Sequence, residues 1–97
     1  MTDQVKISGI NFDVKPFDKA MDKTLMGLVQ YDHNVIFIRE DLPVDRKYET
    51  LLHEVFHVIY KDAALGLDPD EEERVVTAMS AGCYNFLKEN KDVFTLP

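Results

Sequence analysis

The spacing of the apolar residues changes once along the chain, and this change constrains the fold more than any other feature. In the first half, apolar and polar residues alternate with a period of two, as around Val5 and Ile7, which is typical of half-buried strands. After about residue 45 they recur every three or four positions, which is typical of amphipathic helices. We therefore expect an α+β fold, with strands first and two packed helices after them. A chain of 97 residues has room for one core, so 1–97 is expected to form a single domain.

The first half predicts a three-stranded antiparallel sheet. An alternating segment from Val5 to Val14 is interrupted at Gly9, which marks a break or a bulge. Two further runs rich in β-branched residues, Leu25 to Tyr31 and Val35 to Arg39, are expected to pair as a hairpin. The segment between them, Asp32 to Asn34, favours a tight turn because Asp and Asn tolerate a positive φ.

A loop and two helices complete the predicted elements. The loop, Pro16 to Thr24, is largely polar. The first helix runs from about Asp45 to Lys61, and its apolar stripe is expected to face the sheet: Tyr48, Leu51, Leu52, Val55, Phe56 and Ile59. The second helix begins at Asp68, an N-cap acid followed by proline, and Asn90 is its expected end. Met79 and Cys83 lie on its apolar stripe and are expected in the core.

The segment His53 to His57, with the sequence HEVFH, is the strongest sign of chemistry. Two histidines four residues apart project from the same face of a helix, so both imidazoles can reach one ion. Glu54 lies roughly one-third of a turn away, so its carboxylate can act on a water without binding the metal. Zinc-dependent hydrolysis requires this division of roles, with two neutral imidazoles on Zn²⁺ and a carboxylate as general base. The alternative is an incidental pair of surface histidines.

A third ligand is expected from the second helix. The histidine face lies well over ~100° from the apolar stripe of the first helix, so it points away from the sheet. Glu71, Glu72 and Glu73 are the candidates, although acids at a helix N-terminus also stabilise the helix dipole whatever their function. Glu71 is expected to be occupied in a capping box, Glu72 lies near the centre of the apolar stripe, and Glu73 lies near its edge. The positions of Glu72 and Glu73 around the helix axis do not by themselves decide which of the two is the third ligand.

The chain resembles the ImmA/IrrE-like metallopeptidases, and it looks closest to their short, phage-encoded members. The residues that carry the resemblance are Thr50 to His57, with the sequence TLLHEVFH, preceded by a glycine-led strand at Gly27 to Asp32 and an I-x-I strand at Ile36 to Ile38. The family also has a glutamate that begins an E-x-x-A-x-x-F-A helix. Its imperfect counterpart here is formed by Glu73, Val76, Met79 and Ser80.

This resemblance implies a zincin-like fold in which zinc is held by His53, His57 and Glu73, with Glu54 as the general base. It further implies a zinc-dependent metallopeptidase that hydrolyses a peptide bond in a protein or peptide, such as a regulatory protein. An extended substrate is expected to pair with the strand Val35 to Arg39. Donors to a tetrahedral oxyanion are sought among the following residues, although a turn or packing role is favoured for each: Tyr31, His33, Tyr60 and Tyr84.

The sequence is also consistent with two other functions. One is a small acidic protein-binding module in which the zinc site is structural or vestigial. The other is a structural role, in which the metal mainly holds together the two helices of a marginally stable core. The glutamate between the two histidines favours the enzyme, because a structural site would not require Glu54.

Charge and composition exclude several partners. Eleven Lys and Arg against 18 Asp and Glu give a net charge of −7, which repels phosphate backbones and anionic lipids. Neither nucleic acid nor a membrane is therefore expected as a partner. The only cysteine is Cys83, so an intramolecular disulfide is impossible, and the N-terminus does not resemble a secretory signal. We expect a cytoplasmic protein.

Overall fold

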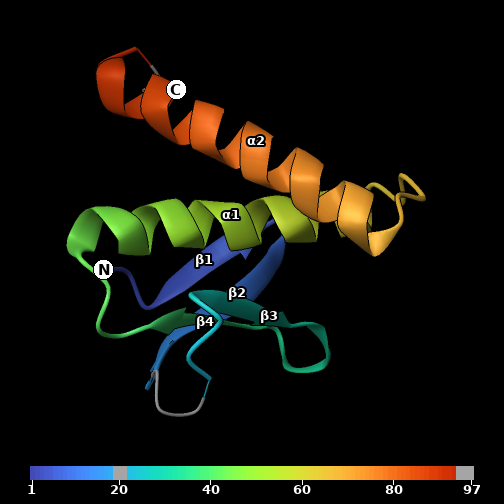
Figure 1. Ribbon diagram of the computed structural model, residues 1–97, viewed down its shortest axis with the longest axis horizontal. Coiled ribbons are helices and arrows are strands. Elements are labelled where there is room, and N and C mark those ends of the chain that lie inside the picture. The colour runs from blue at the N-terminus through green and yellow to red at the C-terminus, as the bar shows by residue number, and fades with distance from the viewer. Residues whose placement is uncertain (19–21, 94–97) are drawn as a thin grey trace.

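A computed structural model of the chain describes residues 1–18 and 22–93 (Figure 1). Residues 19–21, in the expected loop, and 94–97 lie outside the described part. The strands are β1 (Gln4–Ile7), β2 (Ile10–Phe17), β3 (Gly27–Gln30) and β4 (Val35–Arg39), and the helices are α1 (Val44–Asp62) and α2 (Pro69–Glu89). The predicted α+β class, with strands preceding two helices, is confirmed.

The sheet has four strands in the order β1-β2-β4-β3, and the prediction of three antiparallel strands is wrong. β2 pairs parallel to β4, while the β1–β2 and β3–β4 pairs are antiparallel. The break at Gly9 is a tight turn between two strands. Ser8 and Gly9 both have positive φ, 50° and 85°, as a two-residue hairpin requires.

β2 also extends into the segment expected as a loop, because it passes through Pro16. Val14 donates its N–H to Asp3 on the β1 side, and backbone groups alternate along a strand. The missing N–H of Pro16 therefore faces the side of β2 where β1 no longer runs, while Pro16 stays paired in register with Ile38 of β4. A proline at this position removes no hydrogen bond from the sheet.

The turn between β3 and β4 follows the prediction more closely. Tyr31–His33 form one turn of 3₁₀ helix, and Asn34 adopts the left-handed conformation with a φ of 52°. An asparagine tolerates this conformation at little cost. The two runs on either side pair as the expected antiparallel hairpin.

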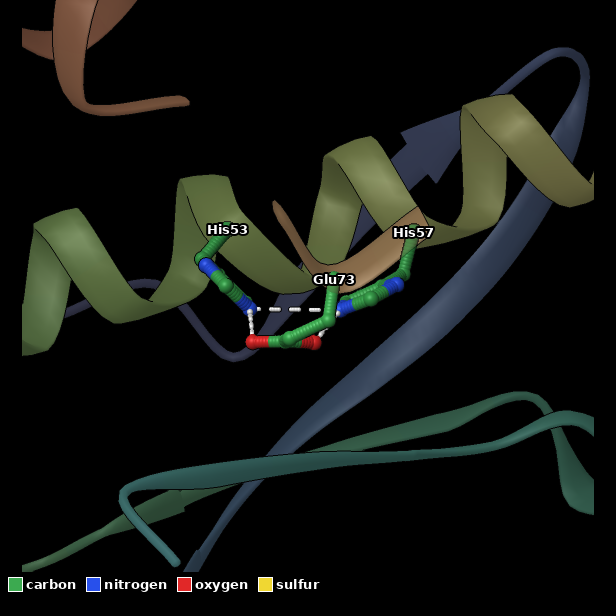
Figure 2. A group of neighbouring side chains, drawn as sticks. All are labelled: His53, His57 and Glu73. Carbon is green, nitrogen blue, oxygen red and sulfur yellow. Dashed lines mark hydrogen bonds and ion pairs between the residues drawn. The ribbon is translucent and has the colours of Figure 1, made fainter. Parts of the chain in front are cut away.

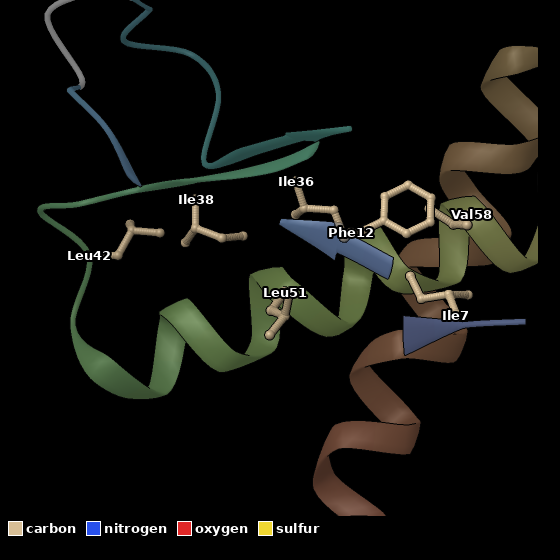
Figure 3. Close-up of a cluster of buried hydrophobic side chains, with 7 residues drawn as sticks. All are labelled: Ile7, Phe12, Ile36, Ile38, Leu42, Leu51 and Val58. Atoms are coloured by element: carbon tan, nitrogen blue, oxygen red, sulfur yellow. The ribbon is translucent and has the colours of Figure 1, made fainter. Parts of the chain in front are cut away.

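α1 lies across one face of the sheet, and α2 lies on the side of α1 away from the sheet (Figure 1). The core between α1 and the sheet is a cluster of buried side chains (Figure 3): Ile7, Phe12, Ile36, Ile38, Leu42, Leu51 and Val58. In the described part of the chain, neither helix is long and apolar enough to cross a membrane.

α1 is rotated relative to the predicted packing. Its buried residues are Thr50, Leu51, Glu54 and Val58, whereas Tyr48 and Ile59 of the expected stripe are 44% and 42% exposed. The rotation places the carboxylate of Glu54 toward the sheet. The apolar stripe of α2 is also covered from one side only, so Met79, which was expected in the core, is 51% exposed. Cys83 is half-buried.

Candidate metal centre

The reversal between the two helices brings the candidate ligands together. The chain turns back after α1 through Ala64 and Gly66, which both have positive φ. Asp68 then caps α2 by accepting a hydrogen bond from the backbone N–H of Glu71 at 2.8 Å. The first turns of α2 therefore start beside the C-terminal half of α1, which places Glu73 over the histidine pair.

Three side chains converge at this point through two imidazole nitrogens and the two oxygens of one carboxylate (Figure 2). Nε2 of His53 lies 3.1 Å from Oε1 of Glu73, and Nε2 of His57 lies 2.9 Å from Oε2 of the same carboxylate. The two Nε2 atoms are 3.2 Å apart. Among the described residues, this is the group of three His, Cys, Asp or Glu side chains whose ligand atoms are close enough to hold a metal ion.

The arrangement fits a small divalent ion. Zinc bonds of ~2.0–2.1 Å at tetrahedral angles place two ligand atoms about 3.3 Å apart. Here the two Nε2 atoms are 3.2 Å apart, and each lies 2.9 or 3.1 Å from its own oxygen of Glu73, so these separations are only slightly shorter. Two imidazole nitrogens and one carboxylate also form a donor set typical of catalytic zinc sites, which keep a fourth position for water or substrate. Glu73 is 58% exposed, so the group is open to solvent on its side.

The structure separates the positions of the three glutamates that the sequence considered as ligands. Glu73 contacts both histidines from the α2 side. Glu72 contacts His57 alone, with Oε2 at 2.7 Å from Nδ1, the ring nitrogen that is not in the cluster. Glu71 lies at the cap with Asp68. The resemblance assigned the third position to Glu73, and the structure places that side chain with His53 and His57.

Glu54 is buried on the sheet side of the cluster, with only 7% of its surface exposed. Burial raises the pKa of Glu54 to about 7; the charge of His57 opposes this shift and the charge of Glu73 adds to it. A carboxyl group with a pKa near neutrality can both accept and release a proton at physiological pH. The sequence predicted Glu54 as the group that acts on water, and its position outside the ligand cluster is compatible with that role.

Burial also acts on His53. It lowers the pKa of His53, and the nearby Glu73 carboxylate opposes this shift. A lower pKa favours the neutral imidazole, which is the form that binds a metal. The electrostatic environment of His53 is therefore compatible with metal binding at neutral pH.

An open cleft of about 710 Å³ lies at the cluster, between β3, α1 and α2. β3 is one of the two edge strands of the sheet, and β4 is paired on both sides. The expectation that a substrate would pair with Val35 to Arg39 is therefore wrong, because that strand has no free edge. The residues lining the β3 side of the cleft are Thr24, Leu25, Met26, Gly27, Leu28 and Val29.

The backbone of β3 is oriented to accept another strand. Met26 accepts a hydrogen bond from the N–H of Arg39 at 2.8 Å, so residues 26, 28 and 30 face β4. Because backbone groups alternate in an antiparallel pair, Gly27 and Val29 direct their N–H and C=O groups away from β4. These two residues give the cleft a free strand edge beside the histidines.

Of the four side chains considered as oxyanion donors, only Tyr31 lines this cleft. Burial raises the pKa of Tyr31 to about 12, with smaller contributions from the charges of Glu72, Glu54 and Asp62. The hydroxyl therefore stays protonated and able to donate. The ammonium of Lys61 lies 3.8 Å from the centroid of the Tyr31 ring. Tyr60 lines a separate hollow beside Leu65, and Tyr84 and His33 are not among the residues of the cleft.

Sequence reasoning missed the role of Gly27 in this site. A Cβ on this glycine would lie 2.7 Å from Cγ2 of Thr50 and 3.2 Å from Cγ of Glu54, so β3 approaches α1 as closely as it does only without a side chain. The signal in the sequence was a glycine at the start of a strand, which marks a close backbone approach.

Comparisons of the chain with protein-family models, with curated proteins and with solved structures gave no match.

Proposed function

We propose that this protein is a zinc-dependent metallopeptidase with a zincin-like arrangement. In this proposal His53, His57 and Glu73 hold the ion, and Glu54 is the general base. The observation that carries the proposal is that a buried carboxylate outside the ligand group lies beside three convergent metal-ligand atoms in an open cleft. A purely structural metal site has no need of this extra carboxylate.

His53, His57 and Glu73 would hold the ion, and a bound zinc would supply Lewis-acid chemistry for the scissile carbonyl and for the attacking water. Glu54 accepts a proton from the attacking water as the new C–O bond forms. It then releases that proton to the leaving amine as the C–N bond breaks. A pKa of about 7 for Glu54 suits both transfers. The hydroxyl of Tyr31 is the candidate donor to the oxyanion.

We place the substrate along β3. The free N–H and C=O groups of Gly27 and Val29 can pair with an extended peptide, as in other cases of strand addition to a sheet edge. Such a peptide runs between β3 and the ligand group, so a carbonyl of its backbone can approach His53 and His57. Paired backbone groups hold the peptide whatever its sequence, so the class of substrate proposed is an unfolded or flexible protein segment.

The test combines metal content with hydrolysis. Mass spectrometry of the purified protein should find about one zinc per chain, and His57→Ala and Glu73→Ala should lose it. Glu54→Gln should keep the zinc and lower hydrolysis of a mixture of unstructured peptides by about 10²–10⁴-fold. Hydrolysis by Glu54→Gln at the wild-type rate would contradict the catalytic role, and a wild type without zinc after reconstitution would contradict the metal site.

A structural role for the metal is the second candidate. One observation favours it: α2 packs mainly against α1, and the candidate ligands come from both of these helices. An ion there would hold α2 in place without any turnover. This role predicts a large loss of thermal stability on chelation, together with no hydrolysis that depends on Glu54.

A further inference from the structure

We infer that Glu72 is a positioning residue that holds the imidazole of His57 in the orientation and tautomer needed for metal binding. This inference rests on the metal site proposed above. It assigns to Glu72 a role distinct from that of Glu73, its neighbour in sequence, which we propose as a ligand.

The geometry around His57 carries the inference. Its Nδ1 lies 2.7 Å from Oε2 of Glu72, and its Nε2 lies 2.9 Å from Oε2 of Glu73, so both ring nitrogens have a carboxylate partner from α2. Figure 2 shows the second nitrogen of His57 directed away from Glu73. The two nitrogens of one imidazole point in divergent directions, so a carboxylate at Nδ1 cannot join the ion held at Nε2.

Both ring nitrogens of His57 meet a carboxylate, and a carboxylate only accepts hydrogen bonds. Once Nε2 and Glu73 hold an ion, Nε2 carries no proton, and Nδ1–H is the group that His57 donates to Glu72. In the neutral ring the lone pair is then on Nε2, which faces His53 and Glu73. The acceptor also stops the ring from turning, which strengthens metal binding by histidine.

The burial of the pair supports a specific role. The side chains of His57 and Glu72 are 15% and 29% exposed, whereas Glu73 is 58% exposed. A hydrogen bond to a charged group is stronger when water is largely excluded from it. Glu72 is also more covered than Glu71 on the preceding position, which is exposed at the cap.

The test is the zinc affinity of four variants, measured by competition with a chromophoric chelator. Glu72→Ala should weaken zinc binding by about 10- to 100-fold while the stoichiometry stays at one. Glu72→Gln should lose less, because its amide oxygen still accepts from Nδ1–H. Glu71→Gln removes the same charge one residue away and is the matched control, with an expected change of less than about twofold. Glu73→Gln should weaken binding more than any of these.

A second readout separates positioning from general stabilisation of α2. Long-range ¹H–¹⁵N spectra of the zinc-loaded protein should show His57 as the Nδ1–H tautomer in the wild type. Cobalt-substituted Glu72→Ala should keep the absorption maximum of the wild type, because the ligand set is unchanged, while Glu73→Gln should shift it. Circular dichroism of each variant establishes that it is folded.

The outcomes distinguish this inference from the proposed function. A wild type that binds no zinc would overturn the metal site and the role of Glu72 with it. A wild type that binds zinc, with Glu72→Ala and Glu71→Gln equal in affinity, would overturn the positioning role alone. A loss of zinc affinity in Glu72→Ala as large as that in Glu73→Gln, together with a shifted cobalt spectrum, would make Glu72 a ligand and would also overturn the inference.

Discussion

Gly27 lies against the side chain of Glu54, so that a Cβ on residue 27 would be 3.2 Å from Cγ and 3.3 Å from Oε2 of that glutamate. The contact joins the start of the edge strand to the sheet-facing side of α1. It therefore sets how far the candidate general base lies from the strand on which we place the substrate. A side chain at residue 27 must move either the strand or the carboxylate.

Gly27→Ala is expected to lower both stability and hydrolysis. The added Cβ would lie 2.7 Å from Cγ2 of Thr50, closer than packed atoms allow, so the backbone or the side chains must shift. Overpacking of this kind typically destabilises a protein by about 1–3 kcal/mol. Urea denaturation measures the stability, and a peptide assay measures the hydrolysis.

The double variant Gly27→Ala with Thr50→Ser separates the two contacts. Serine removes the Cγ2 of Thr50 and keeps its hydroxyl, so stability should recover in large part. The contact with Glu54 remains, so hydrolysis should stay low while zinc content is unchanged. Full recovery of hydrolysis in the double variant would show that Gly27 matters for packing only.

The stability of the metal-free protein should fall as the pH rises through neutrality. The pKa of Glu54 is about 7 in the folded protein against an ordinary 4.5, so the folded state binds this proton more tightly than the unfolded state. The stabilisation is complete below pH 4.5 and is lost as the pH rises to 7 and above. The loss amounts to about 3 kcal/mol for a shift of this size.

The comparison with Glu54→Gln isolates this effect, because glutamine does not titrate. The pKa of His53 is lowered on folding, so its contribution has the opposite sign and is lost as the pH falls. The free energy of unfolding of both proteins is measured by urea denaturation in the presence of a chelator, from pH 4 to pH 9. Subtracting one from the other at each pH removes the contribution of His53, which both proteins share. A constant difference in stability across this range would refute the assigned cause.

The helices could be predicted closely because their signals are local. The predicted ranges Asp45 to Lys61 and Asp68 to Asn90 differ from α1 and α2 by a residue or so at each end. The parallel pairing of β2 with β4 could not be predicted in the same way. Alternation along a strand identifies its faces, but it carries no information about which strand becomes its neighbour.

The site shows the same division between local and tertiary information. The common face of His53 and His57 follows from helix geometry alone. Which of Glu72 and Glu73 reaches both histidines depends on the angle at which α1 and α2 cross. The position of a residue around its own helix gives no information about that angle. The burial of Glu54 also escaped the pattern, because a carboxylate on a sheet-facing position breaks the apolar stripe, as functional residues often do.

Tyr31→Phe is expected to lower hydrolysis without changing the metal. The ring and its contact with Lys61 remain, while the hydroxyl, the proposed oxyanion donor, is removed. Loss of one such donor lowers the catalytic rate by about 10²–10³-fold in known cases. Tyr60→Phe is the matched control, because Tyr60 lies one residue before Lys61 and lines a different hollow. Equal rates for the two variants would exclude Tyr31 from catalysis.

Asp68→Ala is expected to weaken zinc binding through the helix cap. The side chain of Asp68 accepts the backbone N–H of Glu71 at 2.8 Å, and its loss typically destabilises a helix start by about 1 kcal/mol. The residues at this end of α2 include Glu72 and Glu73, so fraying withdraws both from His57. Zinc affinity should fall by up to about fivefold, which is the binding equivalent of that energy.

The variant Asp68→Ser keeps an oxygen that can cap the helix, so it should retain both the stability and the zinc affinity of the wild type. Thermal unfolding and chelator competition measure the two quantities on the same samples. A loss of stability in Asp68→Ala with unchanged zinc affinity would show that the ion itself orders the first turns of α2. Glu72 and Glu73 would then reach His57 without help from the cap.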